Sequence, residues 1–468
     1  MGGASESQAQ LIHIRRSGGR QVARINGKPL SSASQWAYGS LARPAPSAMM
    51  RRRASHMHIL ILNQTFYPDV AATAQHMWDL ARHLRAHGHR VTALTSRIRY
   101  GTDQPFEHAR ETIDGIEIRR MWQTRFGKRH LPGRLCDFLS FYASALIELF
   151  RCAPPDVILA LSSPPMISVL GLLARLFRRR TDGGRIGLVY QTMDVYPDAA
   201  VAMGVLREDS LVARIMRRLT GRTLQAADAV VALGEDMKDL LVRRYRLGPS
   251  ARRRIAVVHP WSDGRELSPL PRPPGSPTFH VVYSGNLGMA HDADTLAAAI
   301  NLTRDDPTIR WTFVGAGRRF DDLRSRFGQD PRVEFLDYEP RARLNESLNR
   351  ADVHLVSQAP QFTGLVVPSK LFGILAVGKP CLMVGPAQAE CSRIISRAEA
   401  GFVIPNGRAD ALVARIRQLR DEPALRERLG ANGRRAFERL FDRPIACERM
   451  RKVIESAAGP TRGDRQVT

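Results

Sequence analysis

The sequence predicts an α/β protein built from two doubly wound, Rossmann-like domains. Short apolar segments alternate with helix-like segments along most of the chain, which is typical of parallel βαβ units. A proline-rich break divides this alternation into two halves. The chain has 468 residues, whereas a single hydrophobic core stops growing at about 250–300 residues. We therefore expect two domains, each with a parallel sheet covered on both faces.

The first alternation spans residues 57–261 and opens at Met57 with the apolar run MHILILNQ. Helical spacing of apolar residues follows over 75–86, and Gly88 ends that helix. Strands are predicted at 58–63, 90–95, 156–161, 186–191, 229–233 and 255–258. This half forms the predicted N-terminal domain.

The break at 262–278 reads SDGRELSPLPRPPGSPT, which predicts an extended linker. The second alternation, 279–440, has predicted strands at 280–284, 311–314, 333–336, 353–357, 381–384 and 402–404. A closing helix is expected within 441–458, followed by a tail at 459–468. Since ligands bind doubly wound sheets at the carboxyl ends of their strands, we expect one cleft between the two halves.

Residues 1–56 differ in composition from the rest of the chain. They hold nine Arg or Lys residues and one acid, Glu6, with no apolar core of a signal peptide. We predict a disordered basic extension, absent from the natural product if translation starts at Met57. A transit peptide is the alternative.

The formal net charge of +25 predicts attraction to anionic partners such as acidic phospholipid, phosphorylated substrates or nucleic acid, although a genomic bias toward arginine explains the excess equally well. The five cysteines are odd in number and show no Cys-x-x-Cys spacing, so reduced thiols in the cytoplasm are expected. No apolar run is long enough to span a bilayer. The apolar segments 131–150 and 166–180 carry flanking arginines and either lie on an anionic membrane face or pack on the sheet.

Two motifs of the second half predict a site for a phosphorylated donor. In YSGNLGMAHD, Gly285 and Gly288 allow close approach of the backbone to phosphate, with Asn286 between them. His291 either supplies a cation there or simply enters the next helix. The turn after WTFV repeats the arrangement at Gly315.

The most specific motif is GLVVPSKLFGILAVGKP at 364–380. Pro368 suits the first turn of a helix, and Ser369 and Lys370 follow it in that turn. A lysine opposes the helix dipole at this place, which suggests that an anion lies nearby; a solvated lysine is the alternative.

The first half offers candidate acceptor-binding residues. Thr73 and Gln75 lie in the small-residue turn YPDVAATAQ before a helix. Asp194 follows the predicted strand 186–191 and is either an acceptor-binding group, a base or a turn-forming residue. At the start of the linker, Trp261 and Asp263 either line the cleft or form a structural hinge.

Taken in order, the segments FYPDVAATAQ, LRAHGHRVTALTS, YSGNLGMAHD, WTFVGAG, VEFLDY, ADVHLV and VVPSKLFGILAVGKP resemble glycosyltransferase family 4. They are similar above all to bacterial enzymes of exopolysaccharide, colanic-acid-type and O-antigen synthesis, and the resemblance covers residues 57–458. It implies the GT-B fold, a nucleotide diphosphate sugar bound in the C-terminal half, an acceptor in the N-terminal half, no cofactor, no required metal and retention of anomeric configuration. It also implies that Gly285, Asn286 and Gly288 face the diphosphate and that Ser369 and Lys370 contact phosphate or ribose.

The sequence departs from the family pattern at three places. Leu365 and Gly373 stand where many members carry two glutamates, and Asn286 and His291 stand where many carry Arg and Lys. A His-Asp pair that is common in the N-terminal domain appears here as Met193-Asp194. These changes put the identity of the donor in doubt.

We predict a glycosyltransferase, peripheral on the inner face of the plasma membrane, that uses a nucleotide sugar and a lipid-linked or polysaccharide acceptor. Asp194 and Lys370 are the predicted catalytic residues. The alternatives are a nucleotide-sugar 2-epimerase on the same fold, a non-catalytic protein that binds acidic polymers, and an inactive partner subunit. Nucleic acid is not an expected partner, because basic and aromatic residues are not interleaved.

Overall fold

The computed structural model describes residues 56–69, 71–100, 104–126, 131–271 and 278–459. Before residue 30 it also describes four two-residue strands that form two antiparallel pairs: β1 (Arg16–Ser17), β2 (Arg20–Gln21), β3 (Arg24–Ile25) and β4 (Lys28–Pro29). The predicted disordered extension and tail therefore lie largely outside the described residues. Residues from His56 onward form one unit, separate from residues 1–55.

The first half of this unit is an eight-stranded sheet with the order β12-β11-β10-β9-β5-β6-β8-β7. Its strands are β5 (His58–Leu62), β6 (Arg90–Ser96), β7 (Arg110–Ile113), β8 (Ile116–Met121), β9 (Val157–Leu161), β10 (Gly187–Gln191), β11 (Ala229–Ala232) and β12 (Ile255–Val257). Its helices are α1 (Ala72–Ala86), α2 (Leu131–Arg151), α3 (Ser168–Phe177), α4 (Asp198–Ala202), α5 (Leu211–Ala226), α6 (Glu235–Arg244) and α7 (Pro249–Arg253). The neighbouring strand residues Ile59 and Leu60 are fully buried in different cores, because successive side chains of a strand point to opposite faces.

The second half is a six-stranded, fully parallel sheet with the order β15-β14-β13-β16-β17-β18. Its strands are β13 (Phe279–Ser284), β14 (Ile309–Val314), β15 (Val333–Leu336), β16 (Val353–Ser357), β17 (Cys381–Val384) and β18 (Gly401–Ile404). Its helical segments are α8 (Asp294–Leu302), α9 (Arg318–Phe327), η2 (Arg341–Arg343), α10 (Leu344–Asn349), η3 (Pro360–Phe362), α11 (Lys370–Ala376), α12 (Glu390–Ala398), α13 (Ala409–Asp421) and α14 (Pro423–Leu440). The alternation predicted from the sequence corresponds to twelve of the strands in the two sheets.

The hairpin of β7 and β8 was not predicted. β7 is the antiparallel edge strand and alternates between exposed and half-buried residues, so it gives no continuous apolar run. Its turn, Asp114–Gly115, has positive φ angles of 50° and 75°. An Asp-Gly pair between two β-like runs is the usual signature of a tight hairpin and would have revealed it.

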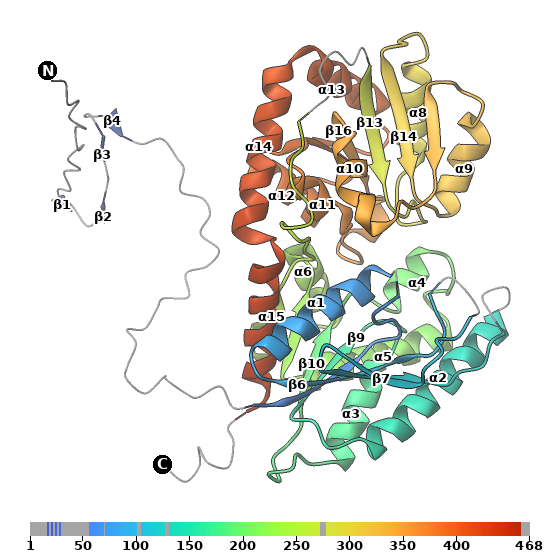
Figure 1. Ribbon diagram of the computed structural model, residues 1–468, viewed down its shortest axis with the longest axis vertical. Helices are drawn as coiled ribbons and strands as arrows, with labels where there is room; N and C mark the ends of the chain where they lie inside the picture. Colours follow the sequence, from blue (N-terminus) through green and yellow to red (C-terminus); the bar gives the residue numbers. More distant parts are fainter. Residues whose placement is uncertain are drawn as a thin grey trace, which may run out of the picture. The chain divides into compact units, whose positions relative to one another are not determined.

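The last helix, α15 (Arg443–Ala457), crosses back from the second half and packs beside α1 of the first (Figure 1). Met450 and Ile454 share the core that contains Ile59. At the crossing, the Arg443 amide donates to the Ser262 carbonyl at 2.9 Å, and its guanidinium lies 2.7 Å from Asp263. The two chain segments that connect the halves are thus joined by a hydrogen bond and an ion pair. Asp263 therefore belongs to a structural hinge.

Candidate functional site

Each sheet has one point where the chain order reverses. In the second half this switch point lies between β13 and β16, and in the first half between β5 and β9. The loops that follow these strands contain the predicted donor residues from Gly285 to His291 and the predicted acceptor residues around Thr73. Both sets therefore lie at the edges where doubly wound sheets bind ligands.

The turns after β13 and β14 touch through their backbones. Gly285 and Gly315 have φ angles of 120° and 135°, and a Cβ on Gly315 would lie 2.4 Å from the Gly285 carbonyl oxygen. Only glycine fits this approach, since the positive φ and the contact both exclude a side chain. The turn that carries Asn286 and Gly288 is thereby fixed in place by its neighbour.

Lys370 lies against this turn although it is distant in sequence. Its Nζ atom donates to the Asn286 carbonyl at 3.1 Å and to the Tyr283 hydroxyl, and lies 3.6 Å from the centre of the Tyr283 ring. Burial holds the pKa of Lys370 well below its usual range. An ammonium group has three N–H donors, so these two contacts leave one for a ligand. Next to it, Ser369 is exposed and Pro368 is buried.

His291 faces the same group but does not supply a second cation. Its Nδ1 atom lies 2.6 Å from the Ser357 carbonyl and must be the donor in that hydrogen bond. Burial, and then the charge of Lys370, lower the pKa of His291 to about 3. The imidazole is therefore neutral near pH 7, and its Nε2 atom is an acceptor. The suggestion that His291 adds positive charge is not supported.

Asp194 lies where the two halves meet. Its backbone amide donates to the Ser162 hydroxyl at 3.0 Å, and the next amide, of Val195, donates to the Leu365 carbonyl of the other half at 3.0 Å. Burial raises the pKa of Asp194 to about 6. Within the part of the chain that the structure describes, its carboxylate has no hydrogen bond or ion pair. This arrangement leaves an ionisable carboxylate available to a ligand.

The other acceptor candidates also lie at the first half's switch point. The Thr73 hydroxyl is 3.0 Å from that of Thr65. The Gln75 side chain accepts a hydrogen bond of 3.2 Å from Arg341 of the second half, and Arg341 is also bonded to Glu266 at 2.9 Å. Gln75 is thus engaged in holding the halves together, a role that the sequence did not suggest.

A second contact between the halves was also missed. Helices α6 and α12 exchange their N-terminal caps: the Glu390 amide donates to Asp236 at 2.9 Å, and the Glu235 amide donates to Glu390 at 2.9 Å. His259 bonds the same Glu390 carboxylate at 2.8 Å. Burial, and then the charge of Glu390, raise the pKa of Asp236 to about 6. No local pattern pairs residues 154 positions apart, so sequence analysis had no signal to find them.

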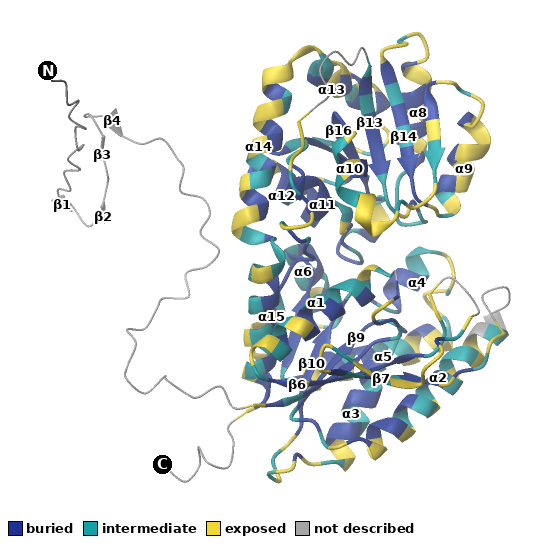
Figure 2. Cartoon of the chain, in the orientation of Figure 1, coloured by how far each residue is buried: buried dark blue, intermediate teal, exposed yellow. Residues whose placement is uncertain are grey.

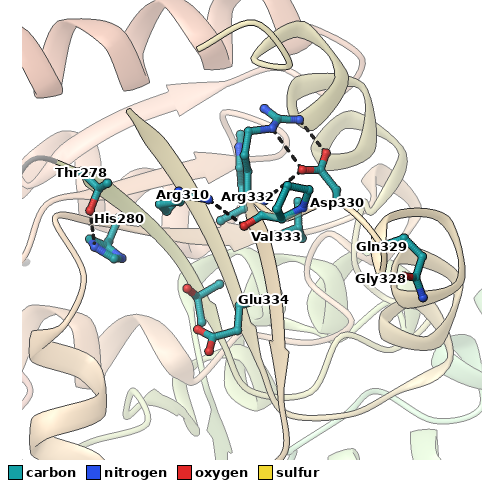
Figure 3. Close-up of a pocket in the computed structure, with 12 residues that line it drawn as sticks. Thr278, His280, Arg310, Gly328, Gln329, Asp330, Arg332, Val333 and Glu334 are labelled. Carbon is teal, nitrogen blue, oxygen red and sulfur yellow. Dashed lines mark hydrogen bonds and ion pairs between the residues drawn. The ribbon is translucent and has the colours of Figure 1, made fainter. Parts of the chain in front are cut away.

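A hollow lies elsewhere, at the opposite end of the second sheet (Figure 3). Its lining includes His280, Arg310 and Val333, which lie near the starts of β13, β14 and β15. Its Arg332 is already paired with Asp330 through contacts of 3.1 and 2.6 Å. The hollow is therefore separate from the glycine turns and is not the donor site.

Two further findings concern predicted properties. All five cysteines lie in described segments and are free thiols, with Cys136 exposed and the others buried. Across the described ranges, no helix combines the length and the apolar character needed to cross a bilayer.

Two doubly wound domains, with a glycine turn and a lysine meeting at the switch point of the second, define a GT-B glycosyltransferase. The chain belongs to this group by sequence: residues 72–261 match the family described as glycosyl transferase 4-like domain, and residues 278–422 match glycosyl transferases group 1.

Curated relatives and solved structures agree with this assignment. The probable glycosyltransferase WbjE of Pseudomonas aeruginosa is 29% identical over 48% of this chain, and the match spans 58% of that protein. The putative colanic acid biosynthesis glycosyl transferase WcaI of Escherichia coli K12 is 25% identical over 77% of this chain and 92% of its own length.

WaaG, a glycosyltransferase involved in lipopolysaccharide biosynthesis, has 17% identity and a TM-score of 0.61, covering 85% of this chain and 99% of its own. Anabaena Alr3699/HepE, solved with UDP and glucose, has 17% identity and a TM-score of 0.61 over 86% of this chain and all of its own, so both structures share the fold.

Proposed function

We propose that this protein transfers a sugar from a nucleotide diphosphate sugar to a lipid-linked or polysaccharide acceptor during synthesis of a cell-surface polysaccharide. The observation that carries the proposal is the contact of Lys370 with the glycine turn at Asn286. This contact places a cation beside backbone groups of the turn, at the edge of the second sheet where doubly wound sheets bind ligands. The names of the relatives WcaI and WaaG support the polysaccharide class of product. The neighbours solved with UDP-glucose and with ADP support a nucleotide sugar as donor.

In the proposed reaction the acceptor oxygen bonds to the anomeric carbon while the bond from that carbon to the diphosphate oxygen breaks. Lys370 stabilises the charge that develops on the leaving diphosphate. The acceptor proton passes to the departing phosphate on the same face of the sugar, which retains the anomeric configuration without a protein nucleophile. Asp194, with its pKa near 6, accepts a hydrogen bond from the acceptor hydroxyl and orients it. No metal or cofactor takes part.

Donor binding is the first test. The full chain is mixed with UDP-, GDP-, ADP- and dTDP-sugars, and the melting temperature is recorded with each. We expect one nucleotide class to stabilise the protein and name the base. No stabilisation by any of them at millimolar concentration would favour an inactive partner or a protein that binds acidic polymers.

Product analysis separates transfer from epimerisation. The preferred donor is incubated with and without a membrane lipid extract, and both the nucleotide sugar and the lipid fraction are analysed. Sugar that appears in the lipid fraction, with the donor's anomeric configuration by NMR, supports the proposal. Conversion of the nucleotide sugar without an acceptor would support the 2-epimerase instead.

We also propose that the first half docks on an anionic membrane. Helices α2 and α3 pack side by side, α3 also packs on α5, and the three carry exposed apolar side chains. Figure 2 marks exposed positions along α2 and α3 in yellow. Leu176 and Phe177 at the end of α3 are 70% and 72% exposed, and the others are Leu135, Leu139, Ile147, Phe150, Leu211, Val212 and Ile215. Exposed arginines accompany them at positions 151, 179, 214, 218 and 222. Apolar side chains among arginines suit a bilayer with acidic headgroups.

Sedimentation with vesicles tests this docking. We expect binding to vesicles that contain phosphatidylglycerol and little binding to pure phosphatidylcholine. The double change Leu176→Ser and Phe177→Ser should reduce the bound fraction, whereas Leu302→Ser, which changes a leucine of α8 that is 54% exposed, should not. Equal binding by all three proteins would refute the docking surface.

A further inference from the structure

A cluster of potential metal ligands lies outside the cleft, between α1 and α15. His83 lies in the last turn of α1, His87 is the C-cap residue just after that helix, and Glu448 of α15 faces both. Helix α1 starts at the cleft near Thr73, and at about 1.5 Å per residue His83 and His87 lie some 15–20 Å further along its axis. The cluster is therefore separate from the proposed donor and acceptor sites.

The spacing of the three side chains is close to that of a tetrahedral metal site, although His87 lies further out. The Glu448 Oε2 atom is 3.3 Å from Nε2 of His83 and 4.0 Å from Nε2 of His87. Ligands about 2.0–2.1 Å from a tetrahedral zinc ion are about 3.3–3.4 Å apart. Small side-chain movements would bring both histidines to that distance. All three ligand atoms already lie within 4.8 Å of one another.

The hydrogen bonds around the cluster also orient its ligands. His87 Nδ1 lies 2.8 Å from the His83 carbonyl and must donate to it, which leaves the lone pair of Nε2 facing Glu448. A backbone carbonyl that holds the far nitrogen of a histidine is the usual support of a metal ligand. The Glu448 carboxylate is held in turn by Arg451, at 2.6 Å from Oε1 and 2.8 Å from Oε2.

The charges nearby limit how strongly a cation binds. Besides Arg451, the Lys452 ammonium lies 3.5 Å from Glu448 Oε1. Glu448 Oε2 accepts hydrogen bonds from Arg451 Nε at 2.8 Å and from His83 Nε2 at 3.3 Å, so a metal ion would take the place of the His83 proton at this oxygen. Two imidazoles with one carboxylate favour zinc or another late first-row ion over magnesium or calcium.

We propose that His83, His87 and Glu448 bind one divalent transition-metal ion, zinc in the cell, with water as the fourth ligand. The side chains of the three residues are 20%, 40% and 32% exposed, so the site is open to solvent. The ion joins the C-terminal helix α15 to α1. Its role is to stabilise the fold, and glycosyl transfer proceeds without it.

Zinc titration of the untagged, metal-stripped full chain tests the proposal. With competition by a chromophoric chelator, we expect one ion per chain, and we expect His83→Gln and His87→Gln each to weaken binding more than tenfold. His108→Gln, which changes an exposed histidine in another loop, is the matched control and should bind as the unchanged protein does. The proposal would be overturned if the double variant H83Q/H87Q bound zinc as tightly as His108→Gln does. It would also be overturned if the unchanged protein took up no zinc from a micromolar solution.

Two further readouts separate a specific site from loose adsorption. Zinc should raise the melting temperature of the unchanged protein and of His108→Gln, but not that of His87→Gln. Cobalt at the site should give a tetrahedral d–d spectrum without a thiolate charge-transfer band, since the adjacent Cys447 is buried. A thiolate band, or equal stabilisation of His87→Gln, would assign the metal elsewhere. Loss of transfer activity on chelation would show that the ion is catalytic, contrary to the proposal.

Discussion

Replacing Lys370 by methionine should have opposite effects on donor binding and on the stability of the empty protein. Methionine keeps an unbranched stem over the Tyr283 ring and removes the charge together with the hydrogen bonds to Tyr283 and Asn286. Because burial depresses the pKa of Lys370, carrying its charge at pH 7 costs folding free energy. The empty variant should therefore be as stable as the unchanged protein or more stable, as is common for residues kept for function.

The loss of donor affinity follows from the contacts of Lys370. Two of its N–H groups are bonded to Tyr283 and Asn286, and the third is left for the donor diphosphate. A hydrogen bond to a charged group contributes about 1.5–3 kcal/mol, which corresponds to a loss of about 10- to 150-fold in affinity. Calorimetric titration with the preferred nucleotide sugar measures this loss, and thermal unfolding of the empty protein measures stability.

The control for this experiment is Lys452→Met, since Lys452 is 69% exposed on α15. It should change neither donor affinity nor stability appreciably. The reasoning would be refuted if Lys370→Met bound the donor normally. It would also be refuted if the empty variant were clearly less stable, because Lys370 would then be a structural ion and not a ligand-binding one.

Three other changes test separate parts of the structure. Asp194→Asn should abolish the rise of kcat/KM with pH near 6, because the carboxylate orients the acceptor only when ionised; a pH profile that still rises in the variant would exclude this role. His354 is fully buried and its pKa is lowered to about 4, so its contribution to stability is complete above pH 6.5 and is lost as pH falls toward 4; by denaturant unfolding, the fall in stability over this range should be about 3 kcal/mol smaller in His354→Gln than in the unchanged protein. Gly315→Ala should cost about 1–3 kcal/mol or more by strain and contact with Gly285, whereas Gly407→Ala, at a positive φ of 81° in open space, should cost less in the same unfolding assay.

The sequence predicted the strands of the sheet interior because they are apolar on both faces. Strands β16 and β17, for example, match the expected ranges residue for residue. The hairpin of β7 and β8 escaped because an edge strand buries one face at most, and only its Asp114–Gly115 turn marked it. The run of apolar residues in a strand is a local feature of the sequence. It therefore predicts strands well where both faces of the strand are buried.

The site was predictable only in part, because local patterns do not show which distant segments come into contact. Gly285 and Lys370 each stand in a local motif, and the structure brings the two residues together, while their role in binding the donor stays a prediction. The neutral state of His291 was not predictable, because it depends on burial and on the charge of Lys370 in another segment. The engagement of Gln75 with Arg341 likewise depends on how the halves meet.

The contacts between the halves also constrain how the cleft can open. Glu390 and Asp236 cap each other's helices, so separating α6 from α12 would leave two helix N-termini and two carboxylates to water alone. The crossing chains are joined near Ser262, where the Arg443 amide is bonded. By contrast, Arg341 meets Gln75 through exposed side chains, whose hydrogen bonds are readily exchanged for bonds to water. We therefore expect the halves to separate most readily on the Arg341 side, by rotation about the α6–α12 contact and the hinge, because the contact of Arg341 with Gln75 is the more exposed to water.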